Sequence, residues 1–268
     1  MLELARIGAP SEERLAATET LLGLLFQEGR DGRLSKVFRQ YMTDCSPYRD
    51  AAFDAMYLSG VLATRTSPVP LRRRDRFFLL VREFAATLEL DGLVAECGCF
   101  RGLSSYLLCS RLKKRDPRFD GSGYRVFDSF SGLSEPQRED ANDDSDAAGT
   151  HPSNVRAGRF TASLDEVRRS LAAFPGIQYF PGWIPQAFPQ DAARYRFVHV
   201  DVDLYQPTKD SLEYFWPRLV SGGRMVCDDY NWPGAKRAVD AFCAAHGLRA
   251  RATASHQAVV ERLAGLEN

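Results

Sequence analysis

The sequence lacks an excess of charge of either sign. Its 35 lysines and arginines balance its 35 aspartates and glutamates, which gives a formal net charge of zero. A protein held on nucleic acid by phosphate neutralisation usually presents a broad basic surface. The charge balance therefore argues against a nucleic-acid partner, while it leaves room for a locally charged site.

Long apolar runs are also absent. No segment approaches the run of about 20 apolar residues that a membrane-spanning helix needs. The N-terminal segment MLELARIGAPSEER carries charged residues too early to contain the apolar core of a signal peptide. We therefore expect no membrane partner, and we expect the protein to be cytoplasmic.

Cysteines are few and scattered along the chain. Of the six cysteines, only Cys97 and Cys99 lie close together, in a C-x-C pattern. This spacing matches neither a zinc site nor a small disulfide framework. We expect free thiols that are buried as small apolar side chains.

The pattern of apolar residues changes near residue 90. The first part reads as amphipathic helices without an obvious catalytic group, whereas short β-branched runs alternate with helices afterwards. Such alternation predicts an α/β fold with a mostly parallel sheet and helices on both faces. The expected parts are an N-terminal helical cap at 1–90 and an α/β domain at 91–268, whose seven strands are 93–96, 124–127, 177–180, 197–202, 224–227 and a closing antiparallel pair at 248–253 and 257–261.

A long polar segment interrupts the α/β pattern at 134–158. It is rich in Gly, Pro, Ser and Asp, and it is too long for an ordinary connection. Loops of this length are commonly either lids or solvated, unstructured segments. The sequence leaves both interpretations open.

A glycine turn follows the first expected strand, in the sequence ECGCFRGLSS. It lacks the third glycine of a dinucleotide fingerprint, and no G-K-[ST] motif is present. Such a turn still brings backbone close to a ligand at the start of a helix. Glu96 at a strand end would repel a pyrophosphate but suits a cationic ligand, and Asp128 at the next strand end can accept ribose hydroxyls. S-adenosylmethionine, with its sulfonium and ammonium groups, satisfies both conditions.

The candidate cofactor-binding residues come from this turn and from the two strand ends that follow it. They are Glu96, Gly98, Arg101, Gly102, Ser104, Asp128, Ser129 and Trp183.

Aspartates gather at the ends of two later strands. The strand VHVDVD places His199, Asp201 and Asp203 on one face by the period of two, and the next strand ends in Asp228-Asp229. In a parallel sheet these ends lie side by side, so carboxylates that would raise one another's pKa come together. Asp201, Asp228 and Asp229 are therefore expected to bind Mg²⁺ or a related hard cation. The alternative is that they cap the following helices.

Two residues of this region are candidate proton acceptors. Asp201 is the first candidate, and His199 is the second because a single histidine within a buried strand is more often structural. The chain lacks a Ser-His-Asp order around a nucleophile elbow, which argues against a hydrolase.

Several longer motifs have a common resemblance. They are ECGCFRGLSS, VFDSFSGL, FPGWIPQAFP, VHVDVDLYQPTKDSL and SGGRMVCDDYNWPGAKRAV. Over roughly residues 90–245 the chain resembles the macrocin O-methyltransferase family, which acts on sugars of macrolide antibiotics and related natural products. The resemblance implies a class I methyltransferase (Rossmann-like) sheet, S-adenosylmethionine as the methyl donor, and Mg²⁺ held by aspartates that match Asp201, Asp228 and Asp229.

The sequence thus predicts a metal-assisted O-methyltransferase whose acceptor is a small hydroxylated molecule, such as a sugar or a macrolide-like natural product. Two alternatives remain open. One is a catechol-type metal-dependent O-methyltransferase, and the other is a non-catalytic scaffold that binds the cofactor. The N-terminal helices are a candidate contact for a homo-oligomer.

Overall fold

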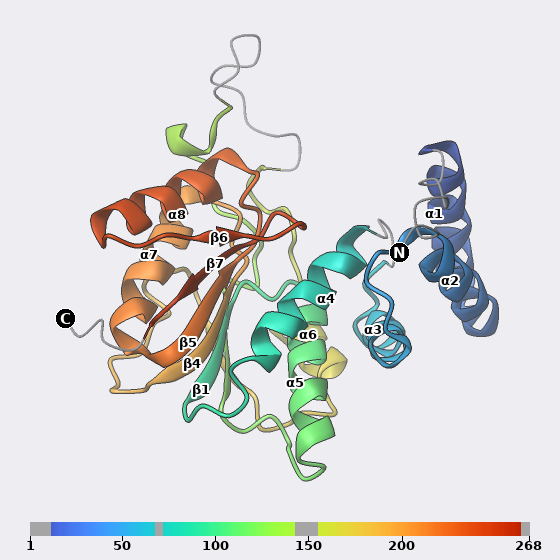
Figure 1. Cartoon of the computed structure of the whole chain (residues 1–268), viewed down its shortest axis with the longest axis horizontal. Coiled ribbons are helices and arrows are strands. Elements are labelled where there is room, and N and C mark those ends of the chain that lie inside the picture. Colours follow the sequence, from blue (N-terminus) through green and yellow to red (C-terminus); the bar gives the residue numbers. More distant parts are fainter. Residues whose placement is uncertain (1–11, 68–71, 143–154, 264–268) are drawn as a thin grey trace, which may run out of the picture.

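A seven-stranded sheet forms the centre of the fold, which the computed structural model describes over residues 12–67, 72–142 and 155–263 (Figure 1). The strand order is β3-β2-β1-β4-β5-β7-β6, with parallel pairing from β3 to β5 and antiparallel pairing of β7 with both neighbours. A mostly parallel sheet closed by an antiparallel pair is confirmed. The strands are β1 (Leu93–Cys97), β2 (Tyr124–Asp128), β3 (Gln178–Pro181), β4 (Tyr195–Val200), β5 (Leu219–Cys227), β6 (Arg251–Ala252) and β7 (Ala258–Glu261).

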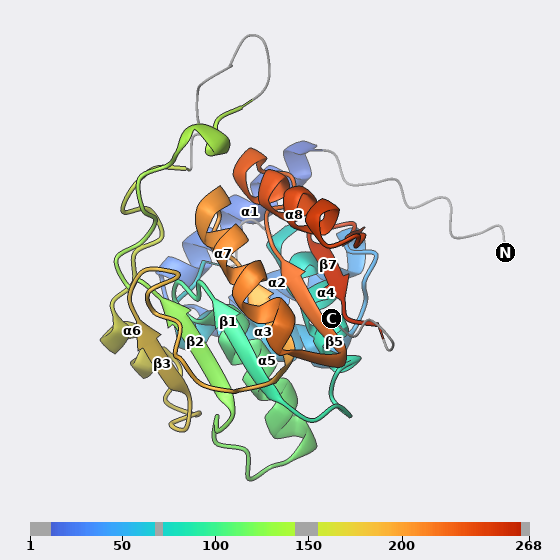
Figure 2. The same cartoon turned by 90° about the vertical axis from the view of Figure 1, so that its left-hand side faces the viewer.

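Helices cover both faces of the sheet. Helices α7 and α8 lie on one face, and α4, α5 and α6 lie on the other (Figures 1 and 2). The helices are α1 (Glu12–Gln27), α2 (Asp31–Cys45), α3 (Ala51–Thr64), α4 (Arg72–Ala85), α5 (Leu103–Arg115), α6 (Leu164–Ser170), α7 (Tyr205–Phe215) and α8 (Pro233–Ala245), with short 3-10 helices η1 (Arg138–Asp140) and η2 (Trp216–Arg218). The predicted capping box is present, because the Ser163 side chain accepts from the Glu166 amide.

The strand order contains a reversal between β1 and β4. From β1 the chain proceeds outward to β2 and β3, whereas β4 and β5 continue from the other side of β1. The loops that leave the carboxyl ends of β1 and β4 therefore diverge, and an open α/β sheet binds its ligands in the crevice between such loops. The fold places the glycine turn and the acidic residues at this crevice.

Alternate residues of each buried strand enter two separate cores. In β1, Val94 belongs to the core under α4 and α5, and Ala95 and Cys97 belong to the core under α7 and α8. The period of two along the strand produces this division. Glu96 consequently faces the α5 side, where Ser105 in the first turn of α5 donates to it.

Helix α4 joins the N-terminal helices to the sheet. Its Phe84 packs edge-on against Phe197 of β4, with ring centroids 5.0 Å apart. Helices α1 and α2 lie farther out, with α3 between them and the body of the fold (Figure 1). The expected boundary at residue 90 thus falls just after a helix that already packs on the sheet, and the division into two domains stays a prediction.

A buried arginine ties α4 to the helices before it. The Arg74 side chain is fully buried, and its Nε and Nη2 donate to Asp54 of α3 over 3.0 and 2.5 Å. Its Nη1 donates to the Tyr48 carbonyl oxygen over 2.7 Å. The guanidinium carbon lies 4.7 Å from the ring centre of Phe53 and 5.0 Å from that of Phe78. All three nitrogens of the Arg74 guanidinium therefore have acceptors, and two aromatic rings lie beside the group.

The strand β4 ends earlier than the sequence analysis expected. It ends at Val200, so Asp201, Val202 and Asp203 lie in the loop before α7, and Asp203 has a left-handed backbone with φ of 61°. The expectation that residues 199, 201 and 203 share one strand face is therefore wrong. The period of two ends where the chain leaves the sheet at Val200, so the loop and not a strand face sets the positions of the two aspartates.

Part of the long polar loop expected at 134–158 is described. Residues 143–154 lie outside the described residues, and η1 precedes them. The buried Asp140 of η1 accepts the backbone N–H of Tyr205, the first residue of α7, over 2.7 Å. The start of the loop is thereby fixed to the start of α7.

Two expectations about composition can be compared with the described part of the chain. None of its helices is both long enough and apolar enough to cross a membrane. The cysteines whose side chains are described are buried free thiols, as expected: Cys97, Cys99, Cys109, Cys227 and Cys243.

Candidate active site

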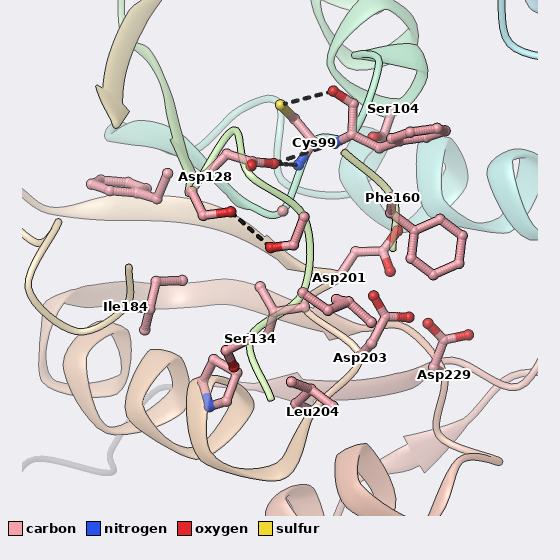
Figure 3. A pocket seen from close by; sticks show the side chains of 18 of the residues that line it. Cys99, Ser104, Asp128, Ser134, Phe160, Ile184, Asp201, Asp203, Leu204 and Asp229 are labelled. Carbon is pink, nitrogen blue, oxygen red and sulfur yellow. Dashed lines mark hydrogen bonds between the residues drawn. The ribbon is translucent and has the colours of Figure 1, made fainter. Parts of the chain in front are cut away.

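A cavity of about 300 Å³ opens at the carboxyl ends of β1, β2 and β4. The glycine turn lines one side of it, and the acidic loop after β4 lines another (Figure 3). Helix α4 contributes Arg73, Arg76 and Phe77 to a third side. The cavity therefore lies at the reversal of strand order, where the fold provides a crevice.

The glycine turn approaches the acidic loop at van der Waals distance. Gly98 has a φ of 78°, and a Cβ built on it would lie 1.9 Å from the Asp201 carbonyl oxygen. Gly102 has a φ of 88° and caps the N-terminus of α5. Only glycine permits both the left-handed backbone and the close approach at position 98. Both glycines predicted as cofactor-binding thus shape the turn at the wall of the cavity.

Asp128 fixes the glycine turn to the end of β2. Its Oδ2 accepts the backbone N–H groups of Cys99 and Phe100 over 2.7 and 3.3 Å, and its Oδ1 accepts that of Phe130 over 2.7 Å (Figure 3). The side chain also lines the cavity. It is therefore held in one orientation with its carboxylate at the cavity wall, in the position expected for a group that accepts ribose hydroxyls.

Glu96 does not reach the cavity, in contrast to the prediction that it binds the cofactor. It is fully buried and is absent from the cavity wall. Its Oε1 lies 2.9 Å from His199 Nδ1, and its Oε2 accepts from the Tyr124 hydroxyl over 2.9 Å and from Ser105. All these partners lie on the α5 side of the sheet. The expectation is corrected because the strand turns this carboxylate into the core rather than toward the crevice.

The other predicted cofactor residues line the cavity. Arg101 donates from Nη1 to the Arg65 carbonyl oxygen over 2.8 Å, and the Ser129 hydroxyl donates to the Gly132 carbonyl oxygen over 2.8 Å. Trp183 is 47% exposed although it is a large aromatic residue. The predicted residues found at the cavity wall are Gly98, Arg101, Ser104, Asp128, Ser129 and Trp183. Gly102 lies in the turn as the N-cap of α5 but is not part of the wall.

The three aspartates predicted to bind a metal do come together, and an arginine lies between them. Nη2 of Arg76 lies 3.1 Å from Asp201 Oδ2 and 3.1 Å from Asp228 Oδ2, and Nη1 lies 3.1 Å from Asp229 Oδ1. The sequence analysis did not find Arg76. The only signal for it was its place in an arginine-rich helix start, which is typical of a solvated helix face.

Asp228 is the most deeply enclosed of the three. Its side chain is fully buried, with Oδ2 bound by Arg76 and by His199 Nε2 at 3.1 Å, and Oδ1 bound by Gln257 Nε2 at 2.6 Å. Burial by itself would raise its pKa, but the charges of Arg76 and His199 and the hydrogen bonds outweigh burial and lower it. Asp228 is therefore a carboxylate whose two oxygens are both engaged.

His199 lies beneath the cluster and not in the cavity. It is fully buried, with one ring nitrogen on Glu96 and the other on Asp228. Burial would lower its pKa, but the Asp228 and Glu96 carboxylates outweigh burial and raise it to about 10. An imidazolium that donates from both nitrogens cannot accept a proton. We therefore correct its candidate role as a base and describe it as the residue that orients Asp228.

Asp203 and Asp201 form the face of the cluster that lines the cavity, together with Asp229 (Figure 3). Oxygens of these three residues lie within 4.8 Å of one another, and so do ligand atoms of His199, Asp201 and Asp228. Burial and the neighbouring carboxylates raise the pKa values of Asp201 and Asp203, although Arg76 acts in the opposite direction. The donor set of carboxylate oxygens suits a hard divalent cation, and Arg76 is the cation that this structure brings to it.

Two aromatic residues that the sequence analysis missed also line the cavity. Phe100 and Phe160 meet edge to face with ring centroids 5.8 Å apart, and both have positive φ values, of 47° and 61°. A non-glycine residue in this backbone region is uncommon and points to a functional constraint. They add an apolar contact to the cavity lining.

Comparison with known proteins identifies similar enzymes. The family profile described as Macrocin-O-methyltransferase (TylF) matches residues 70–260. A tetracenomycin 4'-O-methyltransferase of Streptomyces olivaceus, named for a substrate with a dimethoxy-rhamnosyl group, is 29% identical over 188 residues, which are 67% of this chain and 68% of that protein. The mycinamicin III 3''-O-methyltransferase of Micromonospora griseorubida is 30% identical over 164 residues, which are 59% of this chain but only 63% of that enzyme, less than two thirds of its length.

Solved structures support the same fold. The O-methyltransferase NovP superimposes with a TM-score of 0.58 at 24% identity, over 71% of this chain and 80% of that one. The calicheamicin methyltransferase CalS11 superimposes with a TM-score of 0.60 at 16% identity, over 80% of this chain and 94% of that one. These similarities show that the fold is that of a class I O-methyltransferase, as the sequence predicted.

Proposed function

The chain belongs to the macrocin O-methyltransferase family, and from this premise we propose that it transfers the methyl group of S-adenosylmethionine to a hydroxyl group of a sugar-bearing or otherwise hydroxylated natural product. Two relatives of the chain are named for methylation of tetracenomycin and mycinamicin substrates. The proposal is supported by one observation above all. A single cavity has a glycine turn at one wall and an acidic cluster at another.

The methyl donor would occupy the side of the cavity formed by the glycine turn. There the turn at Gly98 allows close approach of the backbone, and Asp128 offers carboxylate oxygens for ribose hydroxyls. Ser129 and Trp183 line the same cavity and are further candidate contacts. The nearby carboxylates favour a cationic cofactor such as a sulfonium ion over an anionic one.

The acceptor hydroxyl would lie beside Asp201. As the hydroxyl oxygen forms its bond to the methyl carbon, the bond from sulfur to that carbon breaks and S-adenosylhomocysteine leaves. The proton of the hydroxyl passes to the Asp201 carboxylate, which lines the cavity. The two walls of the cavity orient the oxygen and the methyl group toward each other, which supplies the remaining rate enhancement.

The cation-binding part of the proposal concerns Asp201, Asp228 and Asp229, which would hold Mg²⁺. Their carboxylate oxygens are the donors that this ion prefers, and the cluster contains more acidic groups than Arg76 and His199 neutralise. When bound, the ion supplies Lewis acidity that lowers the pKa of the acceptor hydroxyl. His199 keeps Asp228 in orientation by its hydrogen bond.

The test combines binding with turnover. Calorimetry with S-adenosylmethionine should detect one site per chain, and a panel of glycosylated and aromatic diol acceptors should release S-adenosylhomocysteine with the glycosylated members only. Absence of cofactor binding would disprove the proposal. Turnover of catechols alone would leave methyl transfer standing and replace the sugar-bearing acceptor by an aromatic diol.

A further inference from the structure

The acidic cluster carries a cation that the protein itself supplies. Arg76, from α4, reaches the same three carboxylates that the sequence analysis assigned to Mg²⁺, with all three nitrogen–oxygen distances at 3.1 Å. The carboxylates lie 125 or more residues away in the sequence. The position that a metal ion would take among these oxygens is thus the position of a guanidinium group.

A guanidinium and a divalent ion cannot share these oxygens. The guanidinium group of an arginine stays charged at every relevant pH. Mg²⁺ requires oxygens at about 2.0–2.1 Å in near-octahedral geometry. Two cations a few ångströms apart repel strongly where water is excluded. Occupancy by one therefore opposes occupancy by the other.

Arg76 is held less completely than Arg74, two residues earlier in the same helix. All three nitrogens of Arg74 have acceptors, and its side chain is fully buried between two rings. Nε of Arg76 is buried without an acceptor among the described residues, and the side chain keeps 16% of its surface exposed. Arg76 also lines the cavity, so space into which it can withdraw lies beside it.

We propose that Arg76 is an internal competitor for the divalent cation, which binds Asp201, Asp228 and Asp229 only when the Arg76 side chain leaves them for the cavity. Arg76 thereby sets the metal affinity of the site and holds the three carboxylates together before a metal arrives. The inference rests on the proposed function in one respect, since it takes this cluster as the metal site.

Metal affinity tests the proposal directly. Mn²⁺ binding to the full chain is measured by electron paramagnetic resonance for the wild type, for Arg76→Gln and for the control Arg73→Gln, which removes the same charge from the same cavity wall. Arg76→Gln should bind Mn²⁺ more tightly by about tenfold or more, because a repelling charge within a few ångströms is removed. Arg73→Gln should change the affinity by less than about threefold, since its charge lies farther from the three carboxylates. Equal affinities of the two variants would overturn the proposal.

A second comparison covers the case in which Arg76→Gln does not fold. Arg76→Lys keeps the charge but loses the planar fork that bridges the carboxylates. It should bind Mn²⁺ more tightly than the matched Arg73→Lys, and equal binding would overturn the proposal.

In the wild type, Mg²⁺ titration should shift the Arg76 Nε–H resonance in step with saturation. A resonance that stays in place at saturating Mg²⁺ would contradict displacement.

Cofactor binding separates this inference from the proposed function. S-adenosylmethionine affinity of the wild type is measured in the same samples by calorimetry. Cofactor binding together with metal affinities that do not respond to Arg76 would overturn the competition and leave the proposed methyl transfer intact. Absence of cofactor binding, with metal affinities that do respond, would disprove the proposed function and leave the competition standing.

Discussion

The backbone of Gly98 touches the carbonyl group of Asp201: a Cβ on residue 98 would lie 1.9 Å from the carbonyl oxygen. The turn proposed to hold the methyl donor and the loop proposed to hold the acceptor are therefore in direct contact. A shift of the backbone in the turn therefore moves the backbone of the loop directly, without any intervening side chain.

Gly98→Ala should damage both cofactor binding and stability. The left-handed backbone alone costs about 1–2 kcal/mol for a residue with a Cβ, and the contact with Asp201 adds to this. We expect S-adenosylmethionine affinity to fall by about tenfold or more, as measured by calorimetry. The control is Gly32→Ala in α2, where nothing lies within 4 Å of the added Cβ. Unchanged affinity in Gly98→Ala would contradict the location of the cofactor.

Asp201→Asn should abolish most of the transfer and spare the cofactor. Loss of the proton acceptor should reduce kcat by about 10²–10⁴-fold, while S-adenosylmethionine affinity stays nearly unchanged. The measurement is the initial rate of S-adenosylhomocysteine release together with calorimetry. Asp165→Asn, an exposed position in the first turn of α6, serves as the control. A rate within about threefold of the wild type would exclude Asp201 as the acceptor.

Removal of divalent metal should stop methyl transfer. Dialysis against EDTA is expected to eliminate turnover and leave S-adenosylmethionine binding in place, because the cofactor side of the cavity contains none of the three proposed metal ligands. Addition of Mg²⁺ should restore the rate. Full activity in EDTA would remove the metal from the proposed mechanism, and Arg76 would then be the resident cation of the cluster.

His199 should remain an imidazolium across the physiological range. Its pKa is raised to about 10 in the folded protein, whereas an unfolded histidine has a pKa of about 6.5. The stabilisation is therefore complete below about pH 6.5 and is lost as the pH rises toward 10. Nitrogen NMR of the ring at pH 8 should show both nitrogens protonated. The stability advantage of the wild type over His199→Gln should also shrink between about pH 7 and pH 10. A neutral ring at pH 8 would contradict this account.

Arg74→Ala should be among the most destabilising substitutions of the N-terminal region. It removes the buried partner of Asp54 and the cation between Phe53 and Phe78, and breaking a buried pair costs about 3–5 kcal/mol. Denaturant unfolding measures the loss. Arg82→Ala on the same helix, where the arginine is 54% exposed, should change stability by less than about 1 kcal/mol. Equal effects of the two substitutions would show that the buried ion pair is not what holds α4 to α3.

Local sequence patterns were sufficient to predict the sheet and the convergence of the aspartates. Alternation of strands and helices requires a parallel sheet, and parallel strands bring their carboxyl ends to one edge. Asp201, Asp228 and Asp229 therefore come together regardless of how the helices pack on the sheet. The same logic placed Asp128 and the glycine turn at one crevice.

The same patterns could not show which face a strand-end side chain occupies. Glu96 and His199 turn into the core and bind each other, because β1 and β4 are neighbours with these two residues in register. The expected role of His199 depended on a strand that continued past Val200, and a left-handed residue at Asp203 shows that the chain had already left the sheet.

The position of Arg76 in the acidic cluster could not be predicted from the sequence, for a different reason. Which side of α4 faces the cluster depends on the rotation of this helix as it packs on β5 and β4, and this is decided by contacts such as that of Phe84 with Phe197. No local motif encodes a contact between residues 125 positions apart.

The hydrogen bond from Gln257 to Asp228 makes the acidic cluster depend on the segment that leads into β7. Gln257 directly precedes β7, which adds antiparallel to β5, while Arg76 enters the cluster from α4. A nascent chain that has emerged through Asp228 but not through Gln257 lacks this donor. The cluster is therefore complete only once Gln257 has been made, and a chain truncated before Gln257 would leave Asp228 Oδ1 without this hydrogen bond.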